Sequence, residues 1–288
     1  GVERMRFDYY RASLGQGVDA DQVISWMASH QPLGEIAEGR PVMGYEASAH
    51  VLDGEGDTWA TVLHGGPNGV LVQASGEATP AAVEVIRRAW PVHAVTRADV
   101  CVDVIEEETG LFDRLEPTLT RIVREHGRVK AKCIRPVLDR DQGATYMIGS
   151  RASETYFRAY EKPEQMMAEG LAHQSMRVYF DRWVRCELEA KPQKDNRHSA
   201  ATFEPSEYFG LSRMGRAIAS DLLAQVVAKT NSVEYKLLTT KARRRRAIAK
   251  QYGPTLLEWK EDVGSWSEVG LALRDLIEEL EKERSKRR

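Results

Sequence analysis

Ionisable side chains alternate with apolar ones in three short segments of the sequence. Because successive side chains of a β-strand point to opposite faces, each segment would place its ionisable groups on one face. An antiparallel sheet often turns a polar face to water, so the pattern fits a solvated face as well as a functional one. The three faces would hold Arg97, Asp99, Cys101 and Asp103; Tyr156, Arg158, Tyr160 and Lys162; and Arg185, Glu187, Glu189 and Lys191.

Two of these faces carry pairs of carboxylates, which indicate one kind of chemistry. On neighbouring strands they would repel one another unless a cation or the arginines lay among them. Aspartate and glutamate oxygens without histidine or cysteine favour Mg²⁺ or Mn²⁺, which suits phosphate chemistry. A tyrosine on the same face could attack phosphorus, while arginines and lysines hold the flanking phosphates. The candidate metal ligands are Asp99, Asp103, Glu187 and Glu189.

The elements that must position these residues follow from the pattern of the first 204 residues. Short alternating runs and turn residues predict strands over 5–13, 41–52, 58–64 and 70–74, with helices over 19–26 and 79–90. The order then starts again, with strands over 92–105, 129–138, 144–148, 155–161 and 182–190 and helices over 111–126 and 163–172. This order predicts an α+β fold, in which two βαβββα-like halves form an antiparallel or mixed curved sheet with flanking helices.

Helical spacing replaces this pattern after residue 205. Apolar residues four apart predict one helix, and a second helix runs from about residue 233 to a stop at Gly253-Pro254. Ser265 and Glu268 form a capping box at the start of a terminal helix. The sequence therefore predicts a catalytic domain over 1–204 and a helical C-terminal region over 205–288. The apolar residues that define the first of these helices are Met214, Ile218, Leu222 and Val226.

Charge is distributed unevenly along the chain, whose formal net charge is −2. Residues 205–288 hold 17 Lys and Arg against 12 Asp and Glu, a net of +5, which leaves −7 for residues 1–204. A local basic patch would let such a protein bind DNA, although ordinary charge variation accounts for the difference equally well. Four successive residues, Arg243, Arg244, Arg245 and Arg246, suit the phosphate backbone of duplex DNA, with a solvated helix face as the alternative.

Composition excludes several classes of protein. The chain contains no run of eighteen apolar residues and no N-terminal signal pattern, so we expect a cytoplasmic protein without a membrane partner. Three cysteines without a C-x-x-C pair argue against a disulfide framework or a zinc knuckle. The glycine-rich segment 65–69 lacks Gly-Lys-Ser/Thr, so it predicts a hairpin turn instead of a nucleotide-binding loop. We assign the adjacent Tyr9 and Tyr10 to packing, because a strand would put them on opposite faces.

Four segments of the chain, in this order, match the motifs of one protein family. They are Phe7-Asp8-Tyr9-Tyr10-Arg11-Ala12-Ser13; Thr96-Arg97-Ala98-Asp99-Val100-Cys101-Val102-Asp103; Tyr146-Met147-Ile148-Gly149-Ser150-Arg151-Ala152-Ser153 followed by Arg158-Ala159-Tyr160-Glu161-Lys162; and Arg185-Cys186-Glu187-Leu188-Glu189. On these motifs the chain resembles the replication initiation factor family, the Rep_trans type, over roughly Phe7 to Lys191. That family includes initiators of rolling-circle plasmids and filamentous phages, and related conjugative relaxases.

The resemblance implies a role for each candidate. Tyr160, with Arg158 and Lys162 beside it, would become joined to a 5′ phosphate and leave a 3′ hydroxyl that primes replication. Carboxylates of the strands of Asp99 and Glu187 would hold the metal, while the resemblance leaves open which of the four carboxylates do so and which hold arginines. Tyr156 and Tyr146 are the alternative nucleophiles. The candidate phosphate-binding residues are Arg97, Arg151, Arg185, Lys191 and the four arginines from Arg243 to Arg246.

The implied function is that of a rolling-circle replication initiator, a site-specific DNA endonuclease and strand transferase. Its partner would be origin DNA, with a single-stranded nick site and a flanking duplex. Because the sequence holds no ATP motif, we expect a separate helicase, and a homodimer is left open. The alternatives are a conjugative or mobilisation relaxase with the same chemistry and a non-enzymatic DNA-binding regulator on this fold. The seven histidines form no His-x-His motif, which argues against relaxases that hold their metal with histidines.

Overall fold

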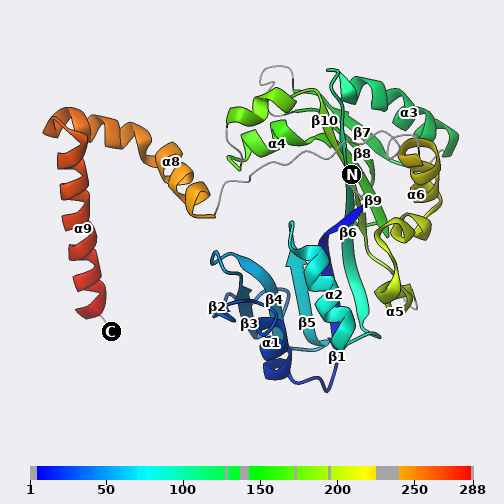
Figure 1. Ribbon diagram of the computed structural model, residues 1–288, viewed down its shortest axis with the longest axis horizontal. Helices are drawn as coiled ribbons and strands as arrows, with labels where there is room; N and C mark the ends of the chain where they lie inside the picture. The colour runs from blue at the N-terminus through cyan, green and yellow to red at the C-terminus, as the bar shows by residue number, and fades with distance from the viewer. Residues whose placement is uncertain are drawn as a thin grey trace. The chain divides into compact units, whose positions relative to one another are not determined.

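A single antiparallel sheet forms the body of the protein. The computed structural model describes residues 5–126, 129–136, 143–171, 174–193, 196–224 and 240–286. The ten strands lie in the order β2-β3-β4-β5-β1-β6-β10-β9-β8-β7 (Figure 1). Every pairing of neighbouring strands is antiparallel, which confirms the predicted antiparallel sheet of an α+β fold.

The sheet consists of two halves that meet at the central pair β1–β6. Counted outward from this pair, the first half runs β1, β5, β4, β3, β2 and the second runs β6, β10, β9, β8, β7. The predicted division of the sheet into two halves is therefore confirmed, although the first half has four strands between its helices where three were predicted, because β2 was missed. The first half comprises β1 (Arg6–Gly15), α1 (Ala20–Ala28), β2 (Ile36–Gly39), β3 (Ala47–Leu52), β4 (Thr58–Gly66), β5 (Gly69–Ser75) and α2 (Thr79–Ala89). The second comprises β6 (Ala94–Ile105), α3 (Leu111–His126), β7 (Ala131–Ile134), β8 (Thr145–Gly149), β9 (Thr155–Glu161), α4 (Lys162–Ala168), η2 (Gln174–Tyr179) and β10 (Trp183–Ala190).

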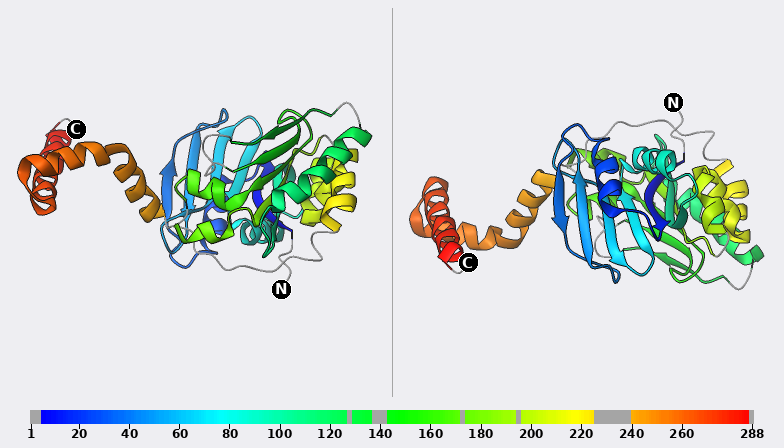
Figure 2. Two further views of the ribbon diagram at one scale, coloured as in Figure 1. Left: turned by 90° about the horizontal axis from the view of Figure 1, so that it is seen from above. Right: turned by 90° about the horizontal axis from the view of Figure 1, so that it is seen from below.

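One face of the sheet carries a hydrophobic core that runs through both halves. Apolar residues of the alternating strands point into it, against apolar residues of α1, α2 and α3. Figure 2 shows the helices α1 (blue) and α2 (cyan) beside the strands of the first half. Because the period of a strand is two, this packing leaves the ionisable residues of the same strands on the other face. The core includes Val100, Val102 and Val104 of β6, Val184, Cys186 and Leu188 of β10, and Met27, Ile86, Leu115 and Leu119 of the helices.

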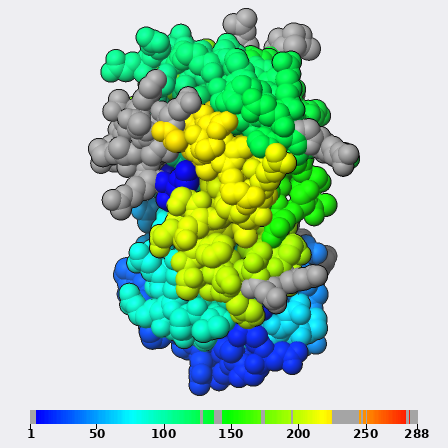
Figure 3. All heavy atoms as spheres, turned by 90° about the vertical axis from the view of Figure 1, so that its right-hand side faces the viewer, coloured from blue at the N-terminus to red at the C-terminus, as the bar shows by residue number. Residues whose placement is uncertain are grey.

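The segment after β10 also packs on this core. It contains α5 (Asn196–Ser199), η3 (Ala200–Thr202), η4 (Pro205–Leu211), α6 (Arg213–Ile218) and a π-helical turn, η5 (Ala219–Leu223). Tyr208 and Phe209 are buried in the core, and in Figure 3 this segment (yellow) lies between α3 (green) and α2 (cyan). The sheet's compact unit therefore extends beyond residue 205. The prediction that the catalytic domain ends at residue 204 and works separately from the helical region 205–288 stays a prediction.

Two long helices, α8 (Thr240–Val263) and α9 (Trp266–Lys286), form a second compact unit. The predicted stop at Gly253-Pro254 is wrong, because α8 continues through Pro254. A proline inside a helix removes one backbone hydrogen bond and kinks the helix without having to end it. At the start of α9, the amide of Glu268 donates to Ser265 Oγ at 3.2 Å, as half of the predicted capping box requires. Within the described residues, no helix is both long enough and apolar enough to cross a membrane.

Smaller differences occur at strand ends. The strand predicted over 41–52 begins at residue 47, because Met43 and Gly44 adopt positive φ angles of 56° and 78° that a strand does not allow. The strand predicted over 129–138 is shorter, over 131–134, and residues 137–142 lie outside the described part of the chain. The helix predicted over 163–172 ends at Ala168, shortly before Gly170 with its φ of 70°.

Leu222→Ala should lower the free energy of unfolding by about 2–5 kcal/mol, because it leaves a cavity in the core beneath the sheet. Leu222 is 2% exposed, whereas Leu33 is 68% exposed and serves as the matched control. We expect Leu33→Ala to change the free energy of unfolding by less than about 0.5 kcal/mol. Urea denaturation followed by circular dichroism measures both variants. Equal effects would contradict the packing of the segment after β10 on the sheet.

Candidate active site

The three predicted ionisable faces lie on neighbouring strands and form one surface, which we call the site face. β10 lies between β6 and β9 in unbroken register with both. Glu189 is opposite Asp99 on one side and Tyr156 on the other. Arg185 is likewise opposite Asp103 and Tyr160, and Glu187 is opposite Arg158.

Burial distinguishes the site face from an ordinary solvated face. Asp99, Glu187 and Glu189 are 4%, 3% and 5% exposed, although charged side chains are rarely buried unless they are paired. Tyr156 and Tyr160 are also buried. The ionisable groups therefore pack on one another instead of standing in water, and each must be held by a partner.

Asp103 lies at the centre of a network of structural contacts. Arg185 donates to both of its carboxylate oxygens, from Nε and Nη2, each at 2.7 Å. Arg6 Nη2 donates to Oδ2 at 2.8 Å and the Trp183 indole donates to Oδ1 at 2.9 Å. Burial alone would raise the pKa of Asp103, but the two arginines hold that pKa well below its usual range.

These contacts change the interpretation of two residues. Asp103 is fully buried, accepts four hydrogen bonds and has its pKa held low by two arginines, so we reassign it from metal ligation to holding Arg185. The third nitrogen of Arg185, Nη1, faces Asp8 Oδ1 at 3.1 Å, so all of its nitrogens contact carboxylates. We therefore assign Arg185 to this buried ion pair instead of to phosphate binding.

Asp99 and Glu189 share a second group of contacts. Arg97 donates to the two oxygens of Asp99 at 2.8 and 2.5 Å and lies 3.1 Å from Glu189 Oε2. Lys191 Nζ lies 2.7 Å from Glu189 Oε1. Burial raises the pKa of Asp99 to about 6, and Glu187 and Glu189 act in the same direction against Arg97. Burial therefore disfavours the charged form of Asp99 even with Arg97 beside it.

Tyr160 is the tyrosine of the site face that contacts a carboxylate. Its hydroxyl donates to Glu187 Oε2 at 3.0 Å, while Glu187 Oε1 accepts from Arg158. Burial, and secondly Glu187, raises the pKa of Tyr160 well above its usual value. The Arg158 guanidinium and the Lys162 ammonium lie 5.6 and 5.7 Å from the centre of its ring. The phenol thus has a proton acceptor in contact and two cations beside it.

The alternative nucleophiles lie in different surroundings. Tyr146 is on the opposite, apolar face of the sheet, and its hydroxyl is 3.1 Å from Thr120 Oγ1 of α3. It therefore does not share a face with the carboxylates. Tyr156 is on the site face, with Arg151 of the β8–β9 turn 6.0 Å from its ring centre. The contacts favour Tyr160 over Tyr156 as the nucleophile, because the Tyr160 hydroxyl donates to the carboxylate of Glu187.

The structure also shows where the predicted phosphate-binding residues lie. Arg151 is exposed in the turn after β8, and its carbonyl oxygen accepts a hydrogen bond from Lys191. The segment 243–246 lies in α8, where the side chain of Arg245 is exposed. The side chains of Arg243, Arg244 and Arg246 lie outside the described part of the structure.

Two groups of carboxylates are candidates for a metal site, but among the described residues only the second brings three ligand oxygens within 4.8 Å of one another. On the site face, Asp99 with the neighbouring Glu187 and Glu189 supplies oxygen donors and a negative charge that a hard cation would compensate. The second group was not predicted from the sequence, because its members come from the end of β9, from α4 and from the turn before β10. Within the described residues, its three carboxylates offer oxygens that all lie within 4.8 Å of one another. They are Glu161, Glu164 and Asp181, and burial raises the pKa of both glutamates to about 7.

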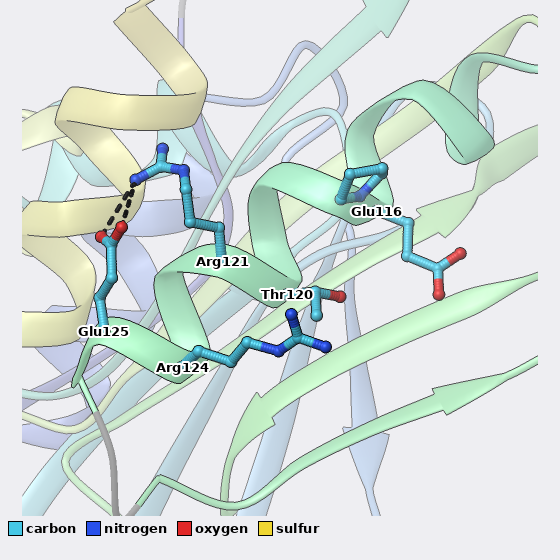
Figure 4. Close-up of a pocket in the computed structure, with 6 residues that line it drawn as sticks. Glu116, Thr120, Arg121, Arg124 and Glu125 are labelled. Atoms are coloured by element: carbon cyan, nitrogen blue, oxygen red, sulfur yellow. Dashed lines mark hydrogen bonds and ion pairs between the residues drawn. The ribbon is translucent and has the colours of Figure 1, made fainter.

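A hollow on the protein surface lies apart from the site face. It is lined along α3, where Arg121 reaches toward Glu125 (Figure 4). Because α3 packs on the apolar face of the sheet, this hollow does not belong to the active site.

A buried tyrosine among carboxylates and arginines, presented by a two-halved antiparallel sheet, defines a class of site suited to phosphoryl transfer. The chain belongs to the replication initiation factor family, whose family model matches residues 93–257, more than half of the chain. Initiation of replication is therefore its function. The match covers β6, β9 and β10, the three strands of the site.

A comparison with solved structures also found a match. The rolling circle replication initiator protein from Geobacillus stearothermophilus is 18% identical, with a TM-score of 0.48. The alignment covers 84% of this chain and 91% of that chain. None of the curated proteins compared with this chain matches it.

Matched substitutions of Asp103 and Asp99 on β6 should distinguish a carboxylate that stabilises the fold from one that does not. Asp103→Asn should lower the free energy of unfolding by about 3–5 kcal/mol, because it leaves buried cations without their counter-charge. The pKa of Asp99 is raised, so its contribution to stability is present at low pH and is lost as pH rises through about 6. At pH 8 in EDTA, Asp99→Asn should therefore leave stability unchanged or raise it by up to about 2 kcal/mol. Urea denaturation measures both, and similar losses would contradict the assignment of Asp103.

Proposed function

We propose that the protein is a rolling-circle replication initiator that nicks one strand of origin DNA with Tyr160. The observation that carries the proposal is the hydrogen bond from Tyr160 to Glu187 beside Arg158 and Lys162. Membership of the replication initiation factor family supports a role for this chemistry in starting DNA replication. A purely DNA-binding regulator would have no need of a buried phenol in contact with a carboxylate.

In the proposed reaction, the Tyr160 oxygen gives its proton to Glu187 and attacks the scissile phosphorus. A bond forms between that oxygen and phosphorus, and the bond from phosphorus to the 3′ oxygen breaks. The 3′ oxygen leaves with the electron pair and takes a proton from water, which yields a free 3′ hydroxyl. Arg158 and Lys162 stabilise the negative charge as the phenolate forms, in a buried site where such interactions are strong.

Asp99, Glu187 and Glu189 would hold a divalent cation, Mg²⁺ or Mn²⁺, on the site face. When bound, the ion would neutralise charge on the non-bridging oxygens of the phosphate. We leave Asp103 out of this set, because it is fully buried and its pKa is held low by Arg185 and Arg6.

The proposed partners follow from this chemistry. A tyrosine on a sheet face can reach one strand of DNA more easily than a closed duplex, so a single-stranded nick site is the substrate. The exposed Arg151 and the basic start of α8 are the candidates for contacts with flanking phosphates. Separation of the strands beyond the nick would need a helicase, and assembly as a homodimer stays a prediction.

Tyr160→Phe should abolish nicking and the covalent adduct, because it removes the attacking oxygen while keeping the ring. Binding of origin DNA should persist. Tyr156→Phe, on the same strand and face, is the matched control and should still nick. A supercoiled plasmid with the protein's own origin reports nicking, and denaturing electrophoresis reports the adduct. Normal nicking by Tyr160→Phe would refute the assignment.

Glu187→Gln should reduce the rate of nicking by about 10²–10⁴-fold, because the amide cannot accept the phenol proton. EDTA should stop nicking by the unaltered protein, and added Mg²⁺ or Mn²⁺ should restore it. DNA binding, measured by fluorescence anisotropy, should change little in either case. Full nicking in EDTA would remove the metal from the proposal.

A further inference from the structure

The site face continues beyond β6 onto the first half of the sheet. In the register, Asp99 is opposite Tyr9, and Arg97 is opposite Arg11, which is opposite Gln73 of β5. Tyr10, between them on β1, points into the core. The expectation that Tyr9 and Tyr10 both serve packing therefore applies to Tyr10, whereas Tyr9 shares a face with the nucleophile.

Tyr9 connects the two halves of this face. Its ring lies 4.5 Å from the Arg97 guanidinium, and its hydroxyl donates to Gln73 Oε1 at 2.9 Å. Arg97 is held from the other side by Asp99 and Glu189. A continuous polar path thus leads from the carboxylates of β6 and β10 to β1 and β5.

Arg11 differs from the other arginines on this path. Nε donates to Thr96 Oγ1 at 2.9 Å and Nη1 to the sulfur of Met43 at 3.2 Å. Within the described part of the chain it forms no ion pair with a carboxylate. Its neighbours all do: Arg6, Arg97, Arg158 and Arg185 each pair with an aspartate or glutamate. Arg11 therefore presents a half-buried positive charge that no carboxylate of the described residues compensates.

The segment 40–46 lies beside Arg11 on the same face. The Tyr45 ring packs on Leu63 and Leu71, while its hydroxyl is buried and has no hydrogen-bond partner among the described residues. A buried hydroxyl without a partner costs stability, so such a group often awaits a ligand or water. Met43 holds a left-handed φ of 56° with its side chain 51% exposed, a conformation that often marks a functional site.

We propose that Arg11, Tyr45 and Met43 form a subsite for single-stranded DNA that flanks the nick. Arg11 holds a backbone phosphate, the Tyr45 hydroxyl donates to the same nucleotide, and the exposed Met43 side chain contacts its base. A charged groove with apolar contacts to the bases is how proteins generally bind a single strand. This inference rests on the proposed nicking function, and it adds where the flanking strand is held.

The position of the subsite sets which nucleotide it reaches. β1 is three strands from β9, about 14 Å at the usual spacing. Along the strands, Arg97 and Asp103 differ by six positions, about 20 Å at the rise of a strand. A strand of duplex DNA rises about 3.4 Å per nucleotide, so the subsite takes a nucleotide several positions from the scissile phosphate. Oligonucleotides with only two nucleotides on each side of the nick would not reach it.

The test compares Arg11→Ala with Arg124→Ala, which removes one exposed positive charge from α3 on the other side of the sheet. Both are made in the Tyr160→Phe background, so that binding is measured without cleavage. For a single strand with ten nucleotides on each side of the nick, Arg11→Ala should weaken binding about tenfold or more and lower the salt slope by about 0.7. Arg124→Ala should do neither. Arg11→Lys should recover part of the affinity.

Further measurements exclude a merely structural role. On the oligonucleotide with two flanking nucleotides, Arg11→Ala should bind like the parent. Tyr45→Phe should bind the long strand several-fold more weakly while unfolding at the same or a higher temperature, because it removes an unsatisfied hydroxyl. Replacing single phosphates by neutral methylphosphonates should reveal one position at which Arg11→Ala has no additional effect.

The outcomes distinguish the two proposals. If no strand of its own origin is nicked by the unaltered protein, the proposed function fails. If nicking occurs but Arg11→Ala and Arg124→Ala bind the long strand equally, the subsite is refuted. A loss of affinity that is equal on long and short strands, or no methylphosphonate position that couples to Arg11, would refute it as well.

Discussion

The pairing of β10 with β6 is the constraint on which the site depends. Eight successive residue pairs join the two strands without a bulge. This register places the charged residues of both strands on one face and most of the apolar ones in the core. Two acidic groups per strand then lie side by side, and burial makes their repulsion costly. Arginines and a lysine neutralise most of that charge, so the ion pairs of the site face are a condition of folding as well as a setting for chemistry. A slip of one residue would bury the carboxylates in the apolar core.

The two halves of the sheet repeat one strand order but carry different side chains on the site face. The second half holds the carboxylates and Tyr160 on β6, β10 and β9, whereas the equivalent strands of the first half carry Gln73, Leu71 and Leu63 on the same face. On β4 and β5 the first half therefore carries apolar and amide side chains where the second half has paired carboxylates, while Arg6 and Asp8 of β1 pair with Asp103 and Arg185 of the second half. The first half also offers Arg11, which has no carboxylate partner in the part of the chain that the structure describes. One half would thus break a bond while the other holds the chain that contains it.

Alternation alone identified the strands of the site, because the period of two in Arg185, Glu187 and Glu189 fits a strand and does not fit a helix. The sequence could not assign partners on that face. Asp99 and Asp103 look equivalent along β6, and their difference comes from Arg6 and Trp183, which other strands bring to Asp103. The acidic group of Glu161, Glu164 and Asp181 was not predicted, because the alternation of β9 places Glu161 on the face opposite Tyr160. Asp181 also lies twenty residues further along the chain. The continuation of α8 through Pro254 was missed because a proline marks a kink or an end by the same local signal.

The place of β10 in the chain has a consequence for how the protein is made. β10 fills the gap between β6 and β9, yet it follows both in sequence. β6 ends at Ile105 and β9 at Glu161, whereas β10 begins only at Trp183, so the second half of the sheet cannot close until the last of its strands has been made. Contacts between segments distant in sequence form slowly, because the loop entropy is lost before they are gained. Until β10 inserts, β6 and β9 both present open edges, which invite pairing with other chains. The same delay leaves Tyr160 of a nascent chain without Glu187 beside it, so under the proposed function newly made protein would be inactive on DNA until β10 is in place.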